Sequence, residues 1–414
     1  MIDLVKNYSI MSRRTKASAV RELLKLTERK EIISFAGGLP SPDSFPVKDI
    51  QEISRKILQE RPSAALQYTP TEGIGELRAE LVKLMAKDGI EVAAENILVT
   101  TSSQQGLDLV GRVFIDPTDP IIVERPSYLS GLQAFSAYGA QFIGVRCDEQ
   151  GMDVAELSEK LKMLRYGEEH YKFIYAVPDF QNPSGVTWST ERRKQVVELA
   201  TRYHILLVDD SPYRELRYEG QRPPSLHGLD QRNTVVTLRS FSKIFAPGLR
   251  LGWVVAHKNI IAKLAVAKQP VDLCTSAYCQ MVAAEFLKQG LLDAQVEKIK
   301  GLYRVRRDAM LEALERHMPK DAGVRWTRPE GGLFLWVTCP EQIDCDEMFP
   351  EALKENVAYV IGSAFHCDGS GRNTMRLNFS YPSVAQIEEG IRRLAGVIKA
   401  RLLSKKPAEA AGRR

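Results

Sequence analysis

A lysine that follows two serines and precedes an arginine is the feature of this sequence best suited to chemistry. Lys243 follows Ser240 and Ser242 in the pattern Ser-x-Ser-Lys, and Arg250 comes seven residues later. A desolvated lysine amine is a nucleophile toward carbonyl groups. Hydroxyl groups and a guanidinium together bind phosphate. The stretch therefore predicts one amine that bonds a carbonyl and one anchor for a phosphate.

The flanking residues predict where this lysine lies. Apolar runs at Thr234–Leu238 and Trp253–Ala256 are typical of buried strands, so Lys243 is expected in a loop at a strand end, beside the core. Gly248 and Gly252 would permit close backbone approach there. The alternative is an ordinary solvated lysine, because most lysines lie at the surface.

A pair of aspartates follows another apolar run. Asp209 and Asp210 come directly after Ile205–Val208, so a carboxylate here is expected to be buried and to need a cation or good donors. A pyridinium nitrogen would serve, and its protonation makes the ring an electron sink. Tyr213 and Asn182 could both donate to an oxygen on such a ring. Asp210 is favoured, although Asp209 competes and either could be a turn residue.

Two further side chains suit a flat, carboxylate-bearing ligand. Arg376 lies in the middle of an expected strand, Met375–Phe379, and a buried arginine requires a bidentate partner such as a substrate carboxylate. An internal salt bridge is the alternative. Tyr128 follows a strand end and could stack on a ring, or be a core aromatic.

A polar segment after a short strand suits an anion. Thr101–Gly106 follows the expected strand Asn96–Thr100 and precedes a helix, which makes Ser103 and Gln104 candidates for phosphate binding. The alternative is an ordinary loop with a serine cap.

Three residues in the N-terminal part are also noted. Gly38 lies in the irregular loop Ala36–Pro40, which could approach a ligand or be a plain turn. Tyr68 is an aromatic in a loop rich in turn residues. Arg21 lies on an expected helix, Ser12–Thr27, where a solvated position is the alternative.

Composition limits the class of protein. The chain has 414 residues, 44% hydrophobic and 26% charged, with a net charge of +5. These values are typical of a soluble globular protein of two domains. The net charge is too small for a chain of this size to indicate a nucleic-acid-binding protein. The six cysteines are scattered without a C-x-x-C, so free thiols and no metal site are expected. No signal peptide or membrane span is visible, which predicts a cytoplasmic location and no membrane partner.

Apolar strands alternate with helices from about Asn96 to His257. This alternation predicts an α/β fold with a large, doubly wound, mainly parallel sheet whose site lies at the carboxyl ends of the strands. A smaller α+β domain is expected to follow. The expected division is residues 1–60 as an N-terminal segment belonging to the small domain, 61–300 as the large domain, 301–403 as the small C-terminal domain and 404–414 as a tail.

Taken together, the motifs resemble the fold-type I pyridoxal-phosphate aminotransferases of class I/II, and within them the α-aminoadipate and kynurenine aminotransferase subgroup. They fall in the family's order and cover nearly the whole chain. The motifs are Phe35–Pro40 (FAGGLP), Gln67–Pro70 (QYTP), Ser103–Leu109 (SQQGLDL), Gln181–Gly185 (QNPSG), Asp210–Tyr213 (DSPY), Ser240–Lys243 (SFSK) with Arg250, and Arg376–Ser380 (RLNFS).

The resemblance implies pyridoxal 5′-phosphate as cofactor and a role for each matching residue. Lys243 would bond the cofactor and then move the substrate proton. Asp210 would pair with the pyridine nitrogen, Tyr213 and Asn182 would hold the phenolic oxygen, and Tyr128 would stack on the ring. The residues implied for the phosphate are Ser103, Gln104, Ser240, Ser242 and Arg250.

The resemblance also implies how substrate and subunits are arranged. Arg376, with Asn182, would clamp the α-carboxylate, and Gly38 would lie beside the substrate. Arg21 matches an arginine that reaches a distal carboxylate in bacterial relatives. Tyr68 would reach the phosphate of the neighbouring subunit, which implies a homodimer with shared sites.

The resulting interpretation is a dimeric ping-pong aminotransferase. The donor would be 2-aminoadipate, an aromatic or a large aliphatic amino acid, with 2-oxoglutarate as acceptor. Two departures from the family pattern are Ser211-Pro212 before the tyrosine and Asp179, which could alter the pocket's charge. A pyridoxal-phosphate lyase on the same fold and an alanine/glyoxylate-type aminotransferase are the alternatives. A regulator with a fused winged helix is disfavoured, because about thirty residues before Phe35 are too few for that domain.

Overall fold

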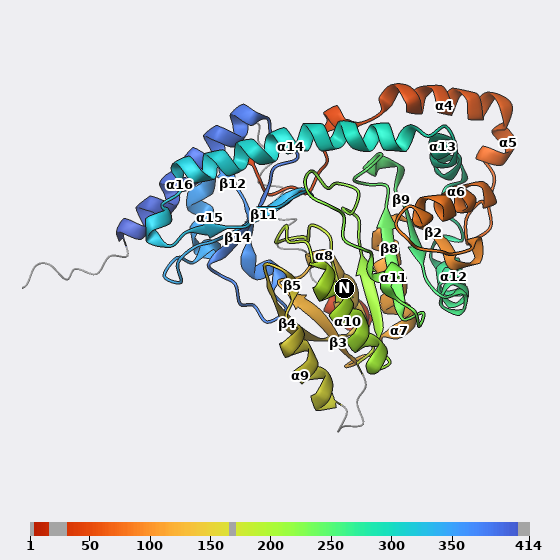
Figure 1. Ribbon diagram of the computed structural model, residues 1–414, viewed down its shortest axis with the longest axis horizontal. Coiled ribbons are helices and arrows are strands. Elements are labelled where there is room, and N and C mark those ends of the chain that lie inside the picture. Colours follow the sequence, from red (N-terminus) through yellow and green to blue (C-terminus); the bar gives the residue numbers. More distant parts are fainter. Residues whose placement is uncertain (1–3, 16–30, 165–170, 405–414) are drawn as a thin grey trace, which may run out of the picture.

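An eight-stranded sheet forms the centre of the larger part of the molecule (Figure 1). The computed structural model describes residues 4–15, 31–164 and 171–404. Strands β8, β7, β6, β3 and β4 are mutually parallel, and β9 runs antiparallel to both of its neighbours. In spatial order the strands are β2 (Ile97–Thr101), β9 (Leu251–Val255), β8 (Val235–Ser240), β7 (Leu206–Asp210), β6 (Phe173–Ala176), β3 (Pro120–Arg125), β4 (Gln141–Asp148) and β5 (Gly151–Met152). The predicted doubly wound, mainly parallel sheet is confirmed.

Helices cover both faces of this sheet, because alternate strand residues point to opposite sides. Phe173 and Tyr175 of β6 belong to one buried cluster, whereas Ile174 and Ala176 belong to another. The first cluster is covered by α7 (Ser102–Phe114), α8 (Leu129–Tyr138) and α12 (Lys258–Asp272). The second is covered by α9 (Val154–Leu164), α10 (Thr190–Arg202) and α11 (Leu226–Leu229).

A smaller α+β part contains a four-stranded antiparallel sheet. Its order is β10 (Arg325–Trp326), β11 (Phe334–Thr338), β14 (Thr374–Asn378) and β13 (Val360–Ile361). Its helices are α14 (Leu291–His317), α15 (Cys345–Lys354) and α16 (Val384–Ser404). The segment 291–318, expected as one helix or two, contains the single helix α14, which runs along the molecule beside α16 (Figure 1).

Residues near the N-terminus join this smaller part. Strand β1 (Ile33–Ser34) pairs in parallel with β12 (Val357–Ala358). The run Val357–Ile361, expected as one strand, is therefore divided, because β12 pairs with β1 while β13 pairs with β14. The exact domain limits at residues 60, 300 and 403 stay predictions.

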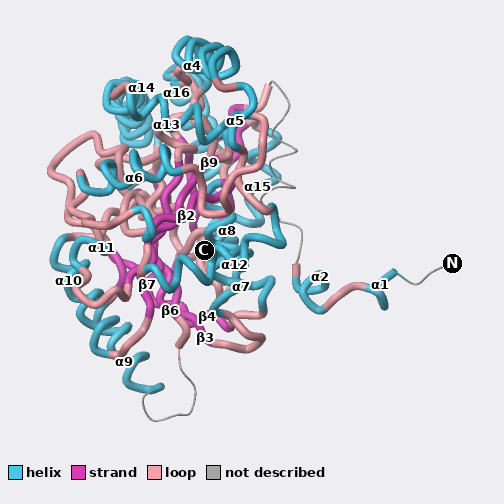
Figure 2. The backbone as a smooth tube through the Cα atoms, turned by 90° about the vertical axis from the view of Figure 1, so that its right-hand side faces the viewer, coloured by secondary structure: helices cyan, strands magenta, loops and turns pink. Residues whose placement is uncertain are grey.

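The remaining helices lie on the outside. Helix α13 (Ala277–Lys288) contacts both α4 (Val47–Glu60) and α6 (Gly75–Ala86), with α5 (Pro62–Ala65) between them in the chain. Two short helices, α1 (Leu4–Asn7) and α2 (Ile10–Arg14), project from the body (Figure 2). The expected helix 12–27 lies mostly outside the described residues. The 3₁₀ turns are η1 (Pro42–Ser44), η2 (Ala94–Asn96), η3 (Pro247–Leu249), η4 (Lys320–Ala322) and η5 (Gly362–Phe365).

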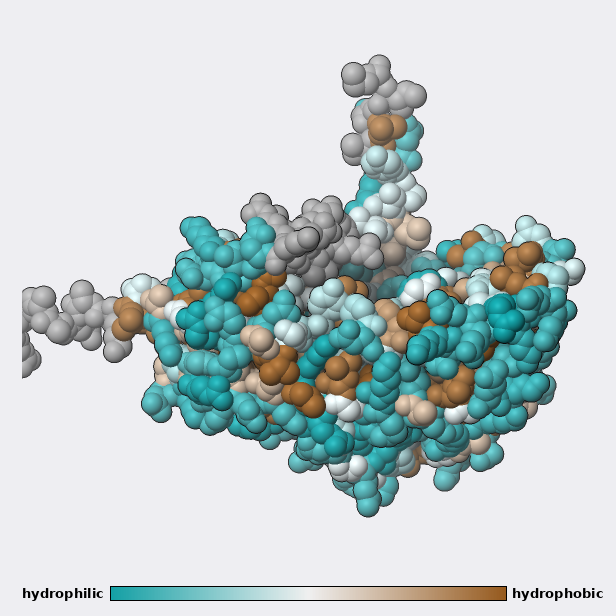
Figure 3. All heavy atoms as spheres, turned by 90° about the horizontal axis from the view of Figure 1, so that it is seen from above, coloured by the Kyte–Doolittle hydropathy of each residue, from teal (hydrophilic) through white to brown (hydrophobic). Residues whose placement is uncertain are grey.

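The surface is mixed in character. The face in Figure 3 is mostly hydrophilic, with apolar residues in small separate groups. Among the described helices, none is both long and apolar enough to cross a membrane.

Candidate active site

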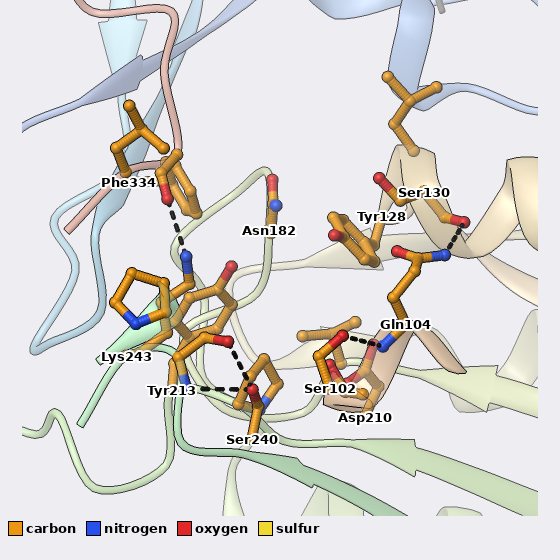
Figure 4. A pocket seen from close by; sticks show the side chains of 18 of the residues that line it. Ser102, Gln104, Tyr128, Ser130, Asn182, Asp210, Tyr213, Ser240, Lys243 and Phe334 are labelled. Carbon is orange, nitrogen blue, oxygen red and sulfur yellow. Dashed lines mark hydrogen bonds between the residues drawn. The ribbon is translucent and has the colours of Figure 1, made fainter. Parts of the chain in front are cut away.

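A cavity of about 360 Å³ lies where strands of the large sheet end and the smaller part begins. Figure 4 shows Lys243, Tyr213 and Asn182 on one side, and Gln104, Ser130 and Tyr128 on the other. The cavity brings together twelve of the residues singled out from the sequence. They are Gly38, Ser103, Gln104, Tyr128, Asn182, Asp210, Tyr213, Ser240, Ser242, Lys243, Arg250 and Arg376.

Lys243 lies in the turn directly after β8, as the apolar runs around it indicate. Its Nζ donates to the carbonyl oxygen of Gly38 at 2.8 Å. Burial, together with the positive charges of Arg376 and Arg250, lowers the lysine's pKa to about 8. Near neutral pH the neutral, nucleophilic form of this amine is therefore far more populated than that of an ordinary lysine, although the protonated form is still the major one.

Asp210 is the aspartate that faces the cavity. It ends β7 and is buried, and its Oδ2 accepts a 2.8 Å hydrogen bond from the Tyr175 hydroxyl. Its Oδ1 has no hydrogen-bond partner among the described residues. Burial raises the pKa of Asp210 to about 7. Asp209, the competing candidate, instead accepts hydrogen bonds from Ser211 and Thr237 and does not line the cavity.

Arg376 extends from the middle of β14 into the same cavity. Its Nη1 donates to Oδ1 of Asn182 at 2.8 Å, and its Nη2 donates to the carbonyl oxygen of Ala36 at 2.7 Å. The guanidinium carbon lies 4.3 Å from the ring centroid of Phe334 and 5.2 Å from that of Phe365. Both contacts are cation–π interactions that hold the guanidinium in place.

Within the described residues, the charge of Arg376 is not neutralised. No acidic side chain among the described residues forms an ion pair with it. The alternative interpretation of Arg376, an internal salt bridge, therefore has no support in the described part of the chain. Burial lowers the pKa of Arg376 to about 10. A buried cation without an anion is unfavourable, so the arginine is suited to receive a carboxylate from a ligand.

Tyr213 and Asn182 lie together beside the lysine. The side-chain oxygen of Asn182 accepts from Arg376, and both Asn182 and Tyr213 line the cavity. Burial raises the pKa of Tyr213, so its phenol stays protonated as a donor. The two residues can present donors to one ligand oxygen.

The expected phosphate anchor forms around the start of α7. Nη2 of Arg250 donates to Oγ of Ser102 at 2.6 Å, and the hydroxyls of Ser240 and Ser242 lie 2.9 Å apart. The backbone N–H groups of a helix's first turn attract anions. This end of the cavity therefore combines hydroxyl groups, a guanidinium and a helix N-terminus.

The expectations for this region need two corrections. The segment 101–106 was expected as a loop before the helix, but α7 begins at Ser102. Close approach was expected at both glycines: a Cβ at Gly252 would lie 2.6 Å from the backbone of Ser102 and Ser103, whereas Gly248 faces open space. Gly252 thus allows β9 to pack against the first turn of α7, and Gly248 has no such function.

Two other predicted residues, Tyr68 and Asp179, lie outside the cavity. The Tyr68 residue is 76% exposed and does not reach the cavity of its own chain. Arg21 lies outside the described residues. Asp179, expected to change the pocket's charge, is buried between Arg193 and Arg214 and lines no part of the cavity. These two arginines lower its pKa against the effect of burial, so it stays a neutralised structural anion.

Sequence reasoning missed four residues at the site. They are Ser102, Tyr175, Phe334 and Phe365. A tyrosine within an apolar strand was a usable signal, because a buried phenol requires a hydrogen-bond partner. Nothing local marks Phe334 or Phe365, which reach Arg376 through the folding of distant segments.

Comparison with known proteins identifies the family. The model of the aminotransferase class I and II family matches residues 30–394. The chain belongs to this family. The aminotransferase is 47% identical to aromatic-amino-acid aminotransferase 1 of Thermococcus litoralis over 96% of this chain and 95% of the relative. It is 42% identical to 2-aminoadipate transaminase of Thermus thermophilus, over 93% of this chain and 95% of the relative.

A solved structure shows the same fold with a cofactor form bound. The Pyrococcus horikoshii kynurenine aminotransferase in complex with PMP is 47% identical to this chain, with a TM-score of 0.93, and the match covers 97% of this chain and 98% of that one. This aminotransferase is a pyridoxal-phosphate-dependent transaminase of fold-type I. The unpartnered Oδ1 of Asp210, buried at one end of the cavity, fits the cofactor's cationic ring nitrogen.

Proposed function

We propose that this aminotransferase transfers the amino group of 2-aminoadipate, an aromatic or a large aliphatic amino acid to 2-oxoglutarate by a ping-pong mechanism. The observation that carries the proposal is one cavity that holds an amine of lowered pKa, Lys243, and a buried arginine without an acidic partner in the described chain, Arg376. An amine for chemistry and a cation for a carboxylate are what an α-amino acid requires.

In this proposal the cofactor is held at four points. Asp210 receives the ring nitrogen at its unpartnered oxygen, Tyr128 covers the ring, and Tyr213 with Asn182 donates to the phenolic oxygen. When bound, pyridoxal phosphate supplies an electron sink for the carbanion at the substrate's Cα. The phosphate is held by Ser103, Gln104, Ser240, Ser242 and Arg250, with Ser102 added from the geometry.

Lys243 acts as the proton carrier. Its Nζ accepts a proton from the substrate's Cα in the donor half-reaction and returns one to the 2-oxo acid's carbon in the other. A pKa of about 8 suits this function, because a general acid–base group is most effective near the working pH. Arg376 holds the α-carboxylate and thereby fixes which Cα bond faces Nζ, with Gly38 leaving room beside the substrate.

The donor class is supported by the cavity and by the relatives. Apolar residues such as Leu39, Pro40 and Phe334 line the cavity together with the cations. Relatives of this chain are named for aromatic amino acids, 2-aminoadipate and kynurenine. A wide, partly apolar site with one fixed carboxylate anchor accepts several large side chains, because single methylenes alter binding only modestly.

We also propose a cytoplasmic homodimer in which Tyr68 completes the phosphate site of the neighbouring subunit. The residue's exposure supports this, since Tyr68 and the nearby Leu66 are each 76% exposed. An aromatic and a leucine exposed to this degree in one loop suit burial against a second copy.

An absorption experiment tests the proposed function. The purified protein is loaded with pyridoxal phosphate and given single amino acids without an acceptor. We expect the visible band of the bound cofactor to convert to that of its amino form, and added 2-oxoglutarate to restore it. The panel of donors then ranks substrates, with alanine and glyoxylate included to test the alanine/glyoxylate alternative. A persistent visible band with release of ammonia or pyruvate would instead identify a lyase.

Arg21 is expected to recognise the distal carboxylate of dicarboxylic substrates. Replacing Arg21 with alanine should raise KM for glutamate and 2-aminoadipate by about 10-fold or more, while KM for leucine and phenylalanine changes little. Steady-state kinetics with the four donors measure this. An equal effect on all four would show that Arg21 does not contact the distal carboxylate.

A further inference from the structure

The counter-ion expected to face the cofactor is itself held by a tyrosine from the neighbouring strand. Tyr175 belongs to β6, is fully buried, and donates its hydroxyl to Oδ2 of Asp210 at 2.8 Å. Because Oδ2 is occupied in this way, Oδ1 is the oxygen without a partner in the described structure. The tyrosine does not line the cavity, so it acts on the cavity only through Asp210.

Helix α8 fixes the position of this tyrosine ring. A Cβ added at Gly131 would lie 2.7 Å from the Tyr175 hydroxyl oxygen, so glycine is what allows the helix to pack against the phenol. One turn later, the Phe135 ring meets the Tyr175 ring edge-on with centroids 5.2 Å apart. Residues four apart lie on one helical face, so both contacts come from the same side of α8. Helix α8 therefore packs against the phenol ring, and the hydroxyl of the same ring donates to Asp210.

The electrostatic surroundings of Tyr175 keep its hydroxyl protonated, so that it always acts as a hydrogen-bond donor. Burial, followed by the charge of Asp210, raises the pKa of Tyr175 well above its ordinary value, so the hydroxyl keeps its proton. The hydrogen bond lowers the pKa of Asp210 and opposes the larger effect of burial. The charge of Asp209, also on β7, raises the pKa of Asp210 further. Asp210 in turn raises the pKa of the nearby phenols Tyr128 and Tyr213, for which burial is the larger cause.

We propose that Tyr175 is a positioning residue for Asp210: its hydroxyl occupies Oδ2, fixes the carboxylate plane, and leaves Oδ1 as the oxygen that receives the cofactor's ring N–H. The inference rests on the proposed role of Asp210. Without the tyrosine, the carboxylate becomes more basic and free to rotate. The proton shared with the ring nitrogen then moves toward the carboxylate, and the ring becomes a weaker electron sink.

The test compares two tyrosines, each of which donates its hydroxyl to an aspartate at 2.8 Å. Tyr175→Phe removes the hydroxyl that donates to Asp210. Tyr138→Phe removes a hydroxyl on α8 that donates to Asp108 at 2.8 Å, outside the cavity. Each protein is loaded with pyridoxal phosphate labelled with nitrogen-15 in the ring. We expect the ring-nitrogen NMR signal of Tyr175→Phe to move toward that of unprotonated pyridine, and the dissociation constant for the cofactor to rise about 10-fold. Tyr138→Phe should match the wild type in both.

Two further variants separate this inference from the role of Asp210. Asp210→Asn should itself shift the signal, and adding Tyr175→Phe to it should cause no additional change. If Asp210→Asn leaves the signal unchanged, the proposed counter-ion is wrong. If Asp210→Asn shifts it but Tyr175→Phe does not, only the positioning role is wrong. Gly131→Ala provides a second test if Tyr175→Phe does not fold. It keeps the phenol but displaces it from Asp210, so it should shift the ring-nitrogen signal in the same direction.

Discussion

Replacing Lys243 with alanine should lower the rate of amino transfer by at least about 10³-fold, since the variant lacks the group that moves the proton. The Lys243 amine has a pKa of about 8, whereas the pKa of the buried Arg376 in the same cavity is about 10. Single-turnover absorption with a saturating amino acid measures the proton-transfer step without contributions from product release. A loss of less than 10-fold would show that another group moves the proton.

The same substitution should make the cofactor-free protein more stable at neutral pH. The pKa of Lys243 is about 8 in the folded chain and 10.5 as its ordinary value, so the unfolded chain binds this proton more tightly. Below pH 8 the protonated amine therefore costs folding about 3 kcal/mol, at 1.36 kcal/mol per pKa unit. This cost falls as pH rises from 8 and vanishes above 10.5.

Urea denaturation of the two cofactor-free proteins tests this linkage. We expect Lys243→Ala to gain stability at pH 7 and to gain progressively less between pH 8 and 10.5. Lys268 is a suitable contrast, because it is also buried but its Nζ lies 2.6 Å from the carboxylate of Asp272. Lys268→Ala should therefore lose stability at pH 7. A loss of stability in both variants would mean that the contacts of Lys243, including its hydrogen bond to Gly38, outweigh the cost of its buried charge.

The strand pattern was readable because burial on two faces leaves a strong local signal. Runs such as Ile121, Ile122 and Val123 are apolar throughout, since successive residues enter the two buried clusters on opposite faces of the sheet. Once parallel strands are expected, their carboxyl ends must share one edge. This topology explains why Lys243 and Asp210, read separately from the sequence, line one cavity.

The choice between neighbouring residues needed the folded chain. Asp209 and Asp210 are both buried and differ in sequence by one position, which in a strand means opposite faces. Only the position of β7 within the sheet decides which face meets the cavity. The polar run 102–106 was misjudged for a related reason: its helix is supported by long-range contacts, the bond from Arg250 to Ser102 and the space left by Gly252.

The surroundings of Arg376 were beyond local reasoning altogether. Its hydrogen-bond partners are Ala36 and Asn182, which lie 340 and 194 residues away in the chain. Its two aromatic neighbours come from β11 and from the turn η5. The sequence could show that a buried arginine needs an anion, but not that the described structure provides none.

Replacing Arg376 with alanine should reduce kcat/KM for every α-amino acid by about 10²–10³-fold, the cost of removing one partner from a buried, hydrogen-bonded charge pair. Arg376→Lys should recover little of this loss, because an ammonium keeps the charge but cannot form the two parallel bonds of a guanidinium. Steady-state kinetics with phenylalanine and glutamate measure both variants. Similar losses for the two donors are expected, since both carry the same α-carboxylate.

A substrate without the α-carboxylate distinguishes two functions of Arg376, binding of the carboxylate and support of the cavity wall. Arg376 also holds Asn182 and the Ala36 carbonyl, so its loss could disturb the cavity even in the absence of a carboxylate. 2-Phenylethylamine is phenylalanine without the carboxylate, and its slow single-turnover reaction should be nearly equal in the wild type and in Arg376→Ala. If the variant slows both compounds by the same factor, Arg376 only stabilises the position of Asn182, and the carboxylate is bound elsewhere. If only phenylalanine slows, the unneutralised guanidinium is the carboxylate site.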